Sequence, residues 1–416
     1  RPAEMPARRW ALAAIAAIVV AGVVMAIALT GSSIVSKDDR QAGLGSFYAA
    51  PDPLPGSAGT LIRTEPLGVE VPGATAMRML YVSQRPNGEL AVSGGMVFVP
   101  DAPAPAGGRP VVAWAHGTIG QGDACAPSRS TNPLQDTANW LDTMMRRGWL
   151  VVATDYTGLG TAGPNLYLVG EAEASDIVHA VEAASQVDGA DASSRFIVWG
   201  HSQGGHSALW TGHLAHELAP QLQLVAVAAA APAAELPLIM GAQWDTAAGW
   251  AIGPEVVDSW PVVDPRLPID TVISSAGSRN ADRLAHECIV AAALEGLART
   301  DAGQEFFAAN PLTNPAWKAM VEAQTPAPLP PDLPVLIGQS TADTVVLAWP
   351  QAALQESWCA AGANLTMDWL GGVNHQQTAV TMGPQAVAWM EQRFGGVPAV
   401  PNCAATPPVE PVAAPS

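Results

Sequence analysis

Basic residues are scarce in this chain of 416 residues, which holds 19 Lys+Arg against 37 Asp+Glu and has a net charge of -18. So few positive charges cannot neutralise a phosphate backbone, which excludes binding to nucleic acid through a basic face. Charged residues of both signs make up only 13% of the chain, whereas hydrophobic residues make up 49%. Disordered chains have the opposite balance, so we expect a folded protein with a large core.

Cysteine is equally scarce, and its spacing is not that of a metal site. The four cysteines form no C-x-x-C pair and have no histidine spacing typical of zinc, so no metal site is predicted. An even number favours disulfides, although four cysteines allow three connectivities and buried free thiols are the alternative. The cysteines are Cys125, Cys288, Cys359 and Cys403.

The first thirty residues differ in composition from the rest. Arg8 and Arg9 precede residues 11–29, an uncharged and mostly apolar segment long enough to cross a bilayer at about 1.5 Å per residue. By the positive-inside rule, the chain that follows lies outside the cytoplasm. A cleaved signal peptide, with a processing site at Ala26-Ile27-Ala28, and a retained membrane anchor both fit this pattern. A buried core helix fits less well, because the segment has no polar face.

Short apolar runs alternate with helical patterns over much of the chain. This alternation predicts a mostly parallel sheet, and the continuous apolar runs predict that helices cover both of its faces. The fold class is therefore α/β. The predicted strands are residues 77–83, 90–99, 110–115, 150–154, 196–199, 224–231, 334–338 and 365–370, and the predicted helices are residues 139–147, 171–184, 204–218 and 378–394.

The strand pattern breaks at Pro232 and stays irregular to about residue 331, which predicts a helical cap inserted into the core. Trp244, Trp250 and Trp260 lie in this segment, either as an apolar binding surface or as the core of the cap itself. The predicted divisions are residues 1–36 as signal peptide or anchor, 37–60 as an extended stem, 61–231 and 332–396 as the two parts of the core, 232–331 as the cap, and 397–416 as a Pro/Ala-rich tail.

The motif that carries chemistry is Gly200-His201-Ser202-Gln203-Gly204. The pattern G-x-S-x-G often arises by chance, but a strand before it and a helix after it predict the nucleophile elbow of an α/β-hydrolase. In such an elbow the serine takes a strained conformation, and the glycines let strand and helix pack closely. The start of the helix then faces the anion that develops in the reaction. Ser202 is the predicted nucleophile; a serine in an ordinary glycine-rich turn is the alternative.

A serine hydroxyl needs a base within about 2.6 to 3.2 Å, and in this fold the histidine comes last in the chain order serine, acid, histidine. His375 lies in a loop between the last predicted strand and the last predicted helix, where the fold requires its base. His286 lies in the irregular segment and is the weaker candidate. Three further histidines lie on the predicted elbow helix and point away from its start: His206, His213 and His216.

The acid is expected after the strand that precedes the histidine loop. Asp343 follows the predicted strand at residues 334–338, whereas Asp332 precedes that strand and Asp368 lies within the next one. We predict that Asp343 holds the imidazole tautomer and stabilises the imidazolium without taking the proton itself. The alternative role for Asp343 is to cap the helix that follows it.

An oxyanion hole in this fold uses two backbone N–H groups, one of them from the residue after the nucleophile. That residue is Gln203. The second donor comes from a loop after an early strand, and His116-Gly117-Thr118 follows such a strand. We assign Thr118 N–H to this position, with Ile119 as the alternative, and we expect His116 to be a structural residue of the loop.

Several of these segments together resemble the secretory lipase family, which includes the fungal lipase A enzymes and many exported bacterial esterases. The resemblance covers about residues 47–403. It implies an α/β-hydrolase with a cap between elbow and acid, serine-dependent ester hydrolysis, and disulfides that join Cys125 to Cys288 and Cys359 to Cys403. The segments that carry it are AWAHGT at 113–118, CAPS at 125–128, DYTGLG at 155–160, YLVG at 167–170 and GHSQGG at 200–205.

We therefore expect an exported serine hydrolase, a monomer that needs no metal or organic cofactor and acts on small-molecule esters or lipids. It is either secreted or attached to the membrane through residues 11–29. An acyltransferase that uses the same three residues with an alcohol acceptor is the alternative. A non-catalytic binding protein on this scaffold is disfavoured, because such proteins usually lack one of the residues that correspond to Ser202, Asp343 and His375.

Overall fold

The computed structural model describes residues 41–137 and 139–411, and the chain divides into two compact units between Ala49 and Ala50. In the first unit, residues 41–48 are helical, so the extended stem predicted for residues 37–60 is wrong over this stretch. Leu44, Phe47 and Tyr48 recur at the i, i+3, i+4 spacing of a helix, which the composition of the segment hid.

The predicted N-terminal signal or anchor at residues 1–36 lies outside the described residues. Within residues 41–137 and 139–411, none of the helices has both the length and the apolar character that a membrane span requires.

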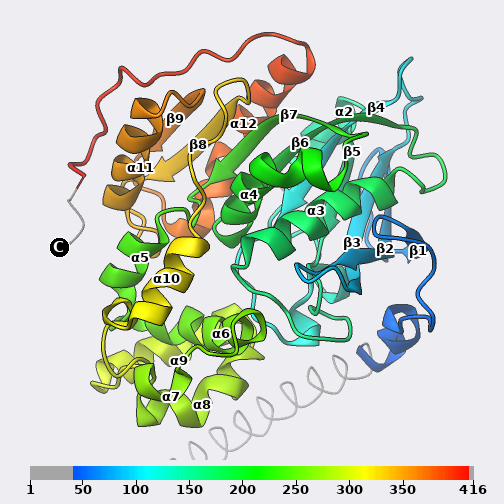
Figure 1. Ribbon diagram of the computed structural model, residues 1–416. Coiled ribbons are helices and arrows are strands. Elements are labelled where there is room, and N and C mark those ends of the chain that lie inside the picture. The colour runs from blue at the N-terminus through cyan, green and yellow to red at the C-terminus, as the bar shows by residue number, and fades with distance from the viewer. Residues whose placement is uncertain (1–40, 138, 412–416) are drawn as a thin grey trace, which may run out of the picture. The chain divides into compact units, whose positions relative to one another are not determined.

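The second unit is built on one sheet of nine strands, in the order β1-β2-β3-β5-β4-β6-β7-β8-β9 (Figure 1). The first four strands in this order pair antiparallel, and from β5 to β9 all neighbours are parallel. This confirms the predicted α/β class. The strands are β1 (Leu61–Pro66), β2 (Ala74–Gln84), β3 (Leu90–Pro100), β4 (Arg109–Ala115), β5 (Leu150–Thr154), β6 (Ala192–His201), β7 (Gln223–Ala230), β8 (Val335–Ser340) and β9 (Leu365–Leu370).

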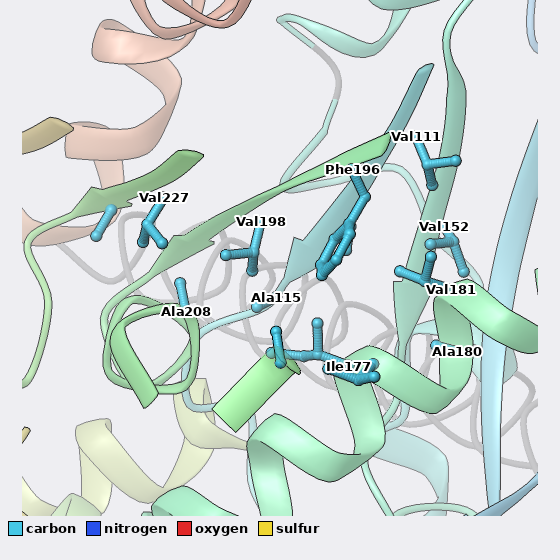
Figure 2. Packing of buried hydrophobic residues seen from close by; sticks show 14 of the residues in the cluster. Val111, Ala115, Val152, Ile177, Ala180, Val181, Phe196, Val198, Ala208 and Val227 are labelled. Carbon is cyan, nitrogen blue, oxygen red and sulfur yellow. The ribbon is translucent and has the colours of Figure 1, made fainter. Parts of the chain in front are cut away.

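Helices cover both faces of this sheet. One face packs against α3 (Gly170–Ala184), α4 (Gln203–Leu218) and α11 (Ala348–Ala360), and the other against α2 (Leu141–Arg146) and α12 (Thr378–Phe394). Figure 2 shows Phe196 and Val198 of β6 on the side of α3, together with Ile177. The residues between and beside them, Ile197 and Trp199, belong to the core on the opposite face. Burial of both faces explains why the strands are continuously apolar.

Residues 232–331 form a group of helices whose core also includes residues 166–169 and Ala172. Trp260 and Trp317 stack with ring centroids 5.7 Å apart, and Trp250 meets Phe306 edge-on at 5.5 Å. The longest helix of the group carries two prolines, which explains why the sequence pattern looked irregular there. The helices are α5 (Leu236–Gln243), α6 (Ala247–Val263), α7 (Ile269–Val272), α8 (Ser275–Ala285), α9 (Ile289–Asp301) and α10 (Pro315–Ala323).

Two disulfides join distant parts of the chain. Cys125 pairs with Cys288 and Cys359 pairs with Cys403, the connectivity that the family resemblance implies. Cys288 is the residue directly before α9, and beside it Ile289 N–H donates to the carbonyl of Ile119 at 3.0 Å. The loop after β4 is thus fastened to the inserted helices by a covalent bond and a hydrogen bond.

The strands β6, β7, β8 and β9 end at one edge of the sheet, and Ser202, Asp343 and His375 follow β6, β8 and β9 there. His201 at the end of β6 is level with Ala230 of β7, and Ser340 at the end of β8 is level with Leu370 of β9. The carboxyl edge of a parallel sheet is where α/β proteins place their sites.

Candidate active site

Ser202 lies in the sharp turn between β6 and α4. Its φ is 56°, a left-handed conformation that non-glycine residues rarely adopt. The turn is this tight because glycine flanks it: a Cβ on Gly200 would lie 2.0 Å from Gly204 O, and one on Gly204 would lie 1.9 Å from Ala115 O. The Ser202 N–H donates to Ala230 O at 2.9 Å, which fixes the turn to β7. The structure thus has the geometry predicted for a nucleophile elbow.

Ser202, His375 and Asp343 form one hydrogen-bonded row. His375 Nε2 lies 2.9 Å from Ser202 Oγ, and His375 Nδ1 lies 2.7 Å from Asp343 Oδ2. All three residues are buried, with exposed fractions of 8% for Ser202, 5% for His375 and 4% for Asp343. Because a carboxylate only accepts, Nδ1 carries the proton and Nε2 is left to accept from the serine. This tautomer is the one that a general base requires.

The Asp343 carboxylate is held on both of its oxygens. Oδ1 accepts the backbone N–H groups of Val345 at 2.8 Å and Val346 at 3.0 Å, which leaves Oδ2 for His375. Gln339 of β8 donates its side-chain amide to Val346 O at 2.9 Å and so holds the same turn from the sheet side. These bonds orient the carboxylate before any substrate binds.

His201 holds His375 from a second side, a role that the sequence reasoning missed. Its Nε2–H donates to the backbone carbonyl of His375 at 3.0 Å, and the two rings lie 4.8 Å apart between centroids. Burial of the ring, with the nearby His375 as a second cause, lowers the pKa of His201 to about 3. His201 is thus a neutral donor at ordinary pH. Its only sequence signal is its place beside the nucleophile in the elbow motif.

This lowered pKa predicts a specific dependence of stability on pH. The unfolded chain binds a proton at His201 below about pH 6.5, whereas the folded protein does not, so stability falls as the pH falls from 6.5 toward 3. His201→Gln keeps a donor but cannot take up this proton. Between pH 5 and 6 the free energy of unfolding, measured by urea denaturation, should depend on pH less steeply in the variant, by up to about 1.4 kcal/mol per pH unit. Parallel curves for the two proteins would contradict this assignment.

The other histidines and aspartates considered from the sequence lie away from this row. His286 ends α8, is exposed, and bonds the carbonyl of Asp282 at 2.8 Å. Asp332 is exposed before β8, and Asp368 lies within β9. His116 Nδ1 lies 2.7 Å from Gly117 O, as expected of a structural residue of its loop.

Gln203 is the first residue of α4, so its N–H is one of those at a helix start that have no acceptor within the helix. Its side chain is fixed by Glu173 of α3, a buried residue that the sequence reasoning missed: Gln203 Nε2 donates to Glu173 Oε1 at 2.7 Å. The same oxygen accepts Leu168 N–H at 2.9 Å, and Oε2 lies 3.0 Å from His206 Nδ1. Glu173 lies four residues before the buried Ile177, on the same face of α3. A carboxylate within an apolar helix face is the sequence pattern that could have identified Glu173.

Thr118, the second predicted oxyanion donor, lies in the loop after β4. Its Oγ1 is 2.8 Å from the hydroxyl of Tyr167, a buried residue from the segment before α3. A Cβ built on the preceding residue, Gly117, would lie 3.1 Å from His201 Nδ1 and 3.4 Å from Ser202 Cβ. The loop is thus next to the predicted nucleophile.

Ser202 lines an apolar cavity of about 720 Å³, a volume that includes the part open to solvent. Trp244 lines the cavity, Trp250 lies in the core of the inserted helices, and Trp260 does both, so each of the two roles that the sequence left open is occupied. Most of the other lining residues come from α5 and α6: Leu236, Ile239, Met240, Gln243, Ala248, Gly249, Ile252, Gly253 and Val256. Across residues 41–137 and 139–411, the structure places no three His, Cys, Asp or Glu side chains where they could share a metal ion.

Comparison with known proteins identifies a family and several relatives of this chain. Residues 127–402 match the family model described as secretory lipase. Lipase 1 of Candida albicans is 22% identical over 320 residues, which cover 68% of this chain and 64% of that protein. Lipase A of Arthroderma benhamiae is 24% identical over 305 residues, which cover 67% of this chain and 62% of that protein. The chain thus spans less than two thirds of the length of these relatives.

Solved structures with low sequence identity share the fold. Candida antarctica lipase A in its closed state superposes with a TM-score of 0.70 at 16% identity, over 89% of this chain and 90% of that one. The rice cell wall degrading esterase LipA of Xanthomonas oryzae superposes with a TM-score of 0.68 at 19% identity, over 82% of this chain and all of that one. The family model covers more than half of the chain and the fold agrees, so this chain belongs to the secretory lipase family.

Proposed function

We propose that this protein is an exported serine carboxylic ester hydrolase that acts on lipid-like esters. The observation that carries the proposal is the hydrogen-bonded row Ser202, His375 and Asp343, with the serine in the lining of an apolar cavity. Both disulfides support a location outside the cytoplasm, because such bonds persist in oxidising compartments.

The proposed reaction has two stages. Ser202 Oγ attacks the acyl carbon while His375 Nε2 takes its proton, and the carbonyl oxygen becomes an oxyanion bound by the N–H groups of Gln203 and Thr118. The oxyanion collapses, the ester bond to the alcohol breaks, and His375 returns the proton to the alcohol that leaves. Water then attacks the acyl-enzyme with His375 as base, which releases the carboxylic acid and restores Ser202.

The cavity is proposed as the acyl site, because its lining is apolar apart from Ser202, Gln243 and the polar edges of Tyr167 and the tryptophans. An acyl chain that fills it removes apolar surface from water, which favours longer acyl groups until the cavity is full. Activity on p-nitrophenyl esters from acetate to palmitate, each measured below and above its solubility limit, tests the proposed function. Product analysis with an added alcohol separates hydrolysis from acyl transfer.

Substitution of Ala248 by Phe tests where the acyl chain binds. Ala248 lines the cavity on α6, and a larger side chain there competes with the acyl group for space. Ala248→Phe should lower kcat/KM for the octanoate ester relative to the butyrate ester by about 5- to 150-fold, the equivalent of about 1–3 kcal/mol of overpacking. Ala291→Phe, at an exposed position of α9, is the control and should leave the ratio unchanged. An unchanged ratio in Ala248→Phe would place the acyl chain elsewhere.

A further inference from the structure

The contact between Thr118 and Tyr167 brings two hydroxyl groups together, one of them on a residue that lines the same cavity as Ser202. Thr118 Oγ1 and Tyr167 Oη lie 2.8 Å apart, and either oxygen could donate on distance alone. Thr118 is half-buried, whereas Tyr167 is only 2% exposed. The direction of this bond decides which of the two protons is available to a substrate.

The burial of Tyr167 sets that direction. A buried hydroxyl proton needs an acceptor, and among the described residues the one hydrogen-bond partner of the Tyr167 hydroxyl is Thr118 Oγ1. Burial, with the nearby Glu255 carboxyl as a second cause, raises the pKa of Tyr167 well above its ordinary value, so the phenol keeps its proton. Tyr167 therefore donates to Thr118 Oγ1, and the proton of Thr118 points elsewhere.

The position of Thr118 in the chain indicates which group its hydroxyl proton can bond to. A Cβ built on its neighbour Gly117 would lie 3.4 Å from Ser202 Cβ, and Tyr167 lines the same cavity as Ser202. Thr118 is thus the residue after the glycine that faces Ser202, on the loop already assigned to the oxyanion hole, and its hydroxyl contacts a tyrosine of the cavity wall. A donor that is fixed there before the reaction stabilises charge without reorganisation.

We propose that the Thr118 side-chain hydroxyl is a further donor to the oxyanion, in addition to the two backbone N–H groups, and that Tyr167 is the positioning residue that orients it. This inference rests on the proposed ester hydrolysis. In the ground state Tyr167 Oη–H donates to Thr118 Oγ1; in the tetrahedral intermediate Thr118 Oγ1–H donates to the negatively charged oxygen that was the ester carbonyl. No bond to Thr118 forms or breaks.

The inserted helices hold Tyr167 in this position. Trp260 Nε1–H donates to Tyr167 O at 3.1 Å, and Tyr167 N–H donates to Ser259 Oγ at 3.1 Å, both from α6. Both bonds use the backbone of Tyr167 and leave its hydroxyl for Thr118. The orientation of the proposed donor therefore depends on α6 as well as on the loop after β4.

The test is a double-mutant cycle on the full chain with p-nitrophenyl butyrate as substrate. Thr118→Val keeps the backbone N–H and the shape of the side chain, and should lower kcat by about 10- to 100-fold with KM within about twofold, because the lost bond forms only in the transition state. Thr118→Ala should do the same, and Thr118→Ser should keep at least a third of kcat. Tyr167→Phe should lower kcat by about 5- to 10-fold in the natural chain, but by less than about twofold when Thr118 is already Val.

The possible outcomes separate this inference from the proposed function. If Thr118→Val and Thr118→Ala, folded by circular dichroism, both keep more than a third of kcat, the hydroxyl is not a donor. Equal effects of Tyr167→Phe in both backgrounds would show that Tyr167 does not act through Thr118. The function itself fails only if the natural chain hydrolyses no ester or if Ser202→Ala retains the full rate.

Discussion

Ser202→Ala is expected to lower kcat for p-nitrophenyl butyrate by about 10⁶, the loss typical of a serine nucleophile in a triad. The serine oxygen is the atom that bonds to the acyl group, and 2.9 Å from His375 Nε2 it is the hydroxyl that the base can deprotonate. Without it the chemistry falls back to direct attack by water, with only the oxyanion donors to help. Steady-state rates on purified protein measure the effect.

Ser278→Ala is a matched control for this experiment. Ser278 is an exposed serine of α8, so its loss should leave kcat and KM unchanged. The alanine at position 202 removes one oxygen and leaves the turn intact, so the melting temperature should change little. A rate in Ser202→Ala close to that of the natural protein would exclude the triad as the source of activity.

Asp343→Asn has the second-largest expected effect, a fall in kcat of about 10⁴ with the fold unchanged. The reason lies in the bonds to Oδ1, which accepts N–H groups from Val345 and Val346. An asparagine must therefore place its oxygen there and turn its NH₂ group toward His375. The histidine then carries its proton on Nε2, where it can no longer accept the proton of Ser202.

Asp332→Asn provides the comparison, because this exposed aspartate precedes β8 and is not in the row. Its kcat should equal that of the natural protein. If Asp343→Asn keeps more than about a tenth of kcat, the carboxylate does not control the histidine tautomer and another acid must be sought. Pre-steady-state release of p-nitrophenol would show whether acylation is the slowed step.

The sequence predicted most of the fold, because the fold depends on local patterns. Each apolar run of a covered parallel strand, such as the one at Phe196 to Trp199, is recognisable without its neighbours. The three residues of the row could be chosen in advance because each follows a strand and the carboxyl ends of parallel strands meet. The helix α11 was not predicted, and α6 was hidden by Pro254 and Pro261.

The supporting contacts could not be predicted, because they join residues far apart in sequence. His201 and the backbone of His375 are 174 positions apart, and Gln203 and Glu173 are 30 apart. Nothing in the local pattern of either segment indicates which carbonyl or carboxylate the tertiary fold will bring near. The prediction for residues 41–48 was wrong although the information was local. The helical spacing of the apolar residues was present, but the glycines of the segment favoured an extended stem.

The most direct test of the central claim, that Ser202 is the acyl acceptor activated by His375, is covalent labelling of the full chain with a p-nitrophenyl alkylphosphonate. Attack by an activated serine on phosphorus releases p-nitrophenol and leaves a stable phosphonate ester. We predict one adduct per chain on the peptide that contains Ser202, complete loss of esterase activity, and no adduct in His375→Ala. An adduct on a different residue, or continued ester hydrolysis by protein fully labelled at Ser202, would contradict the claim.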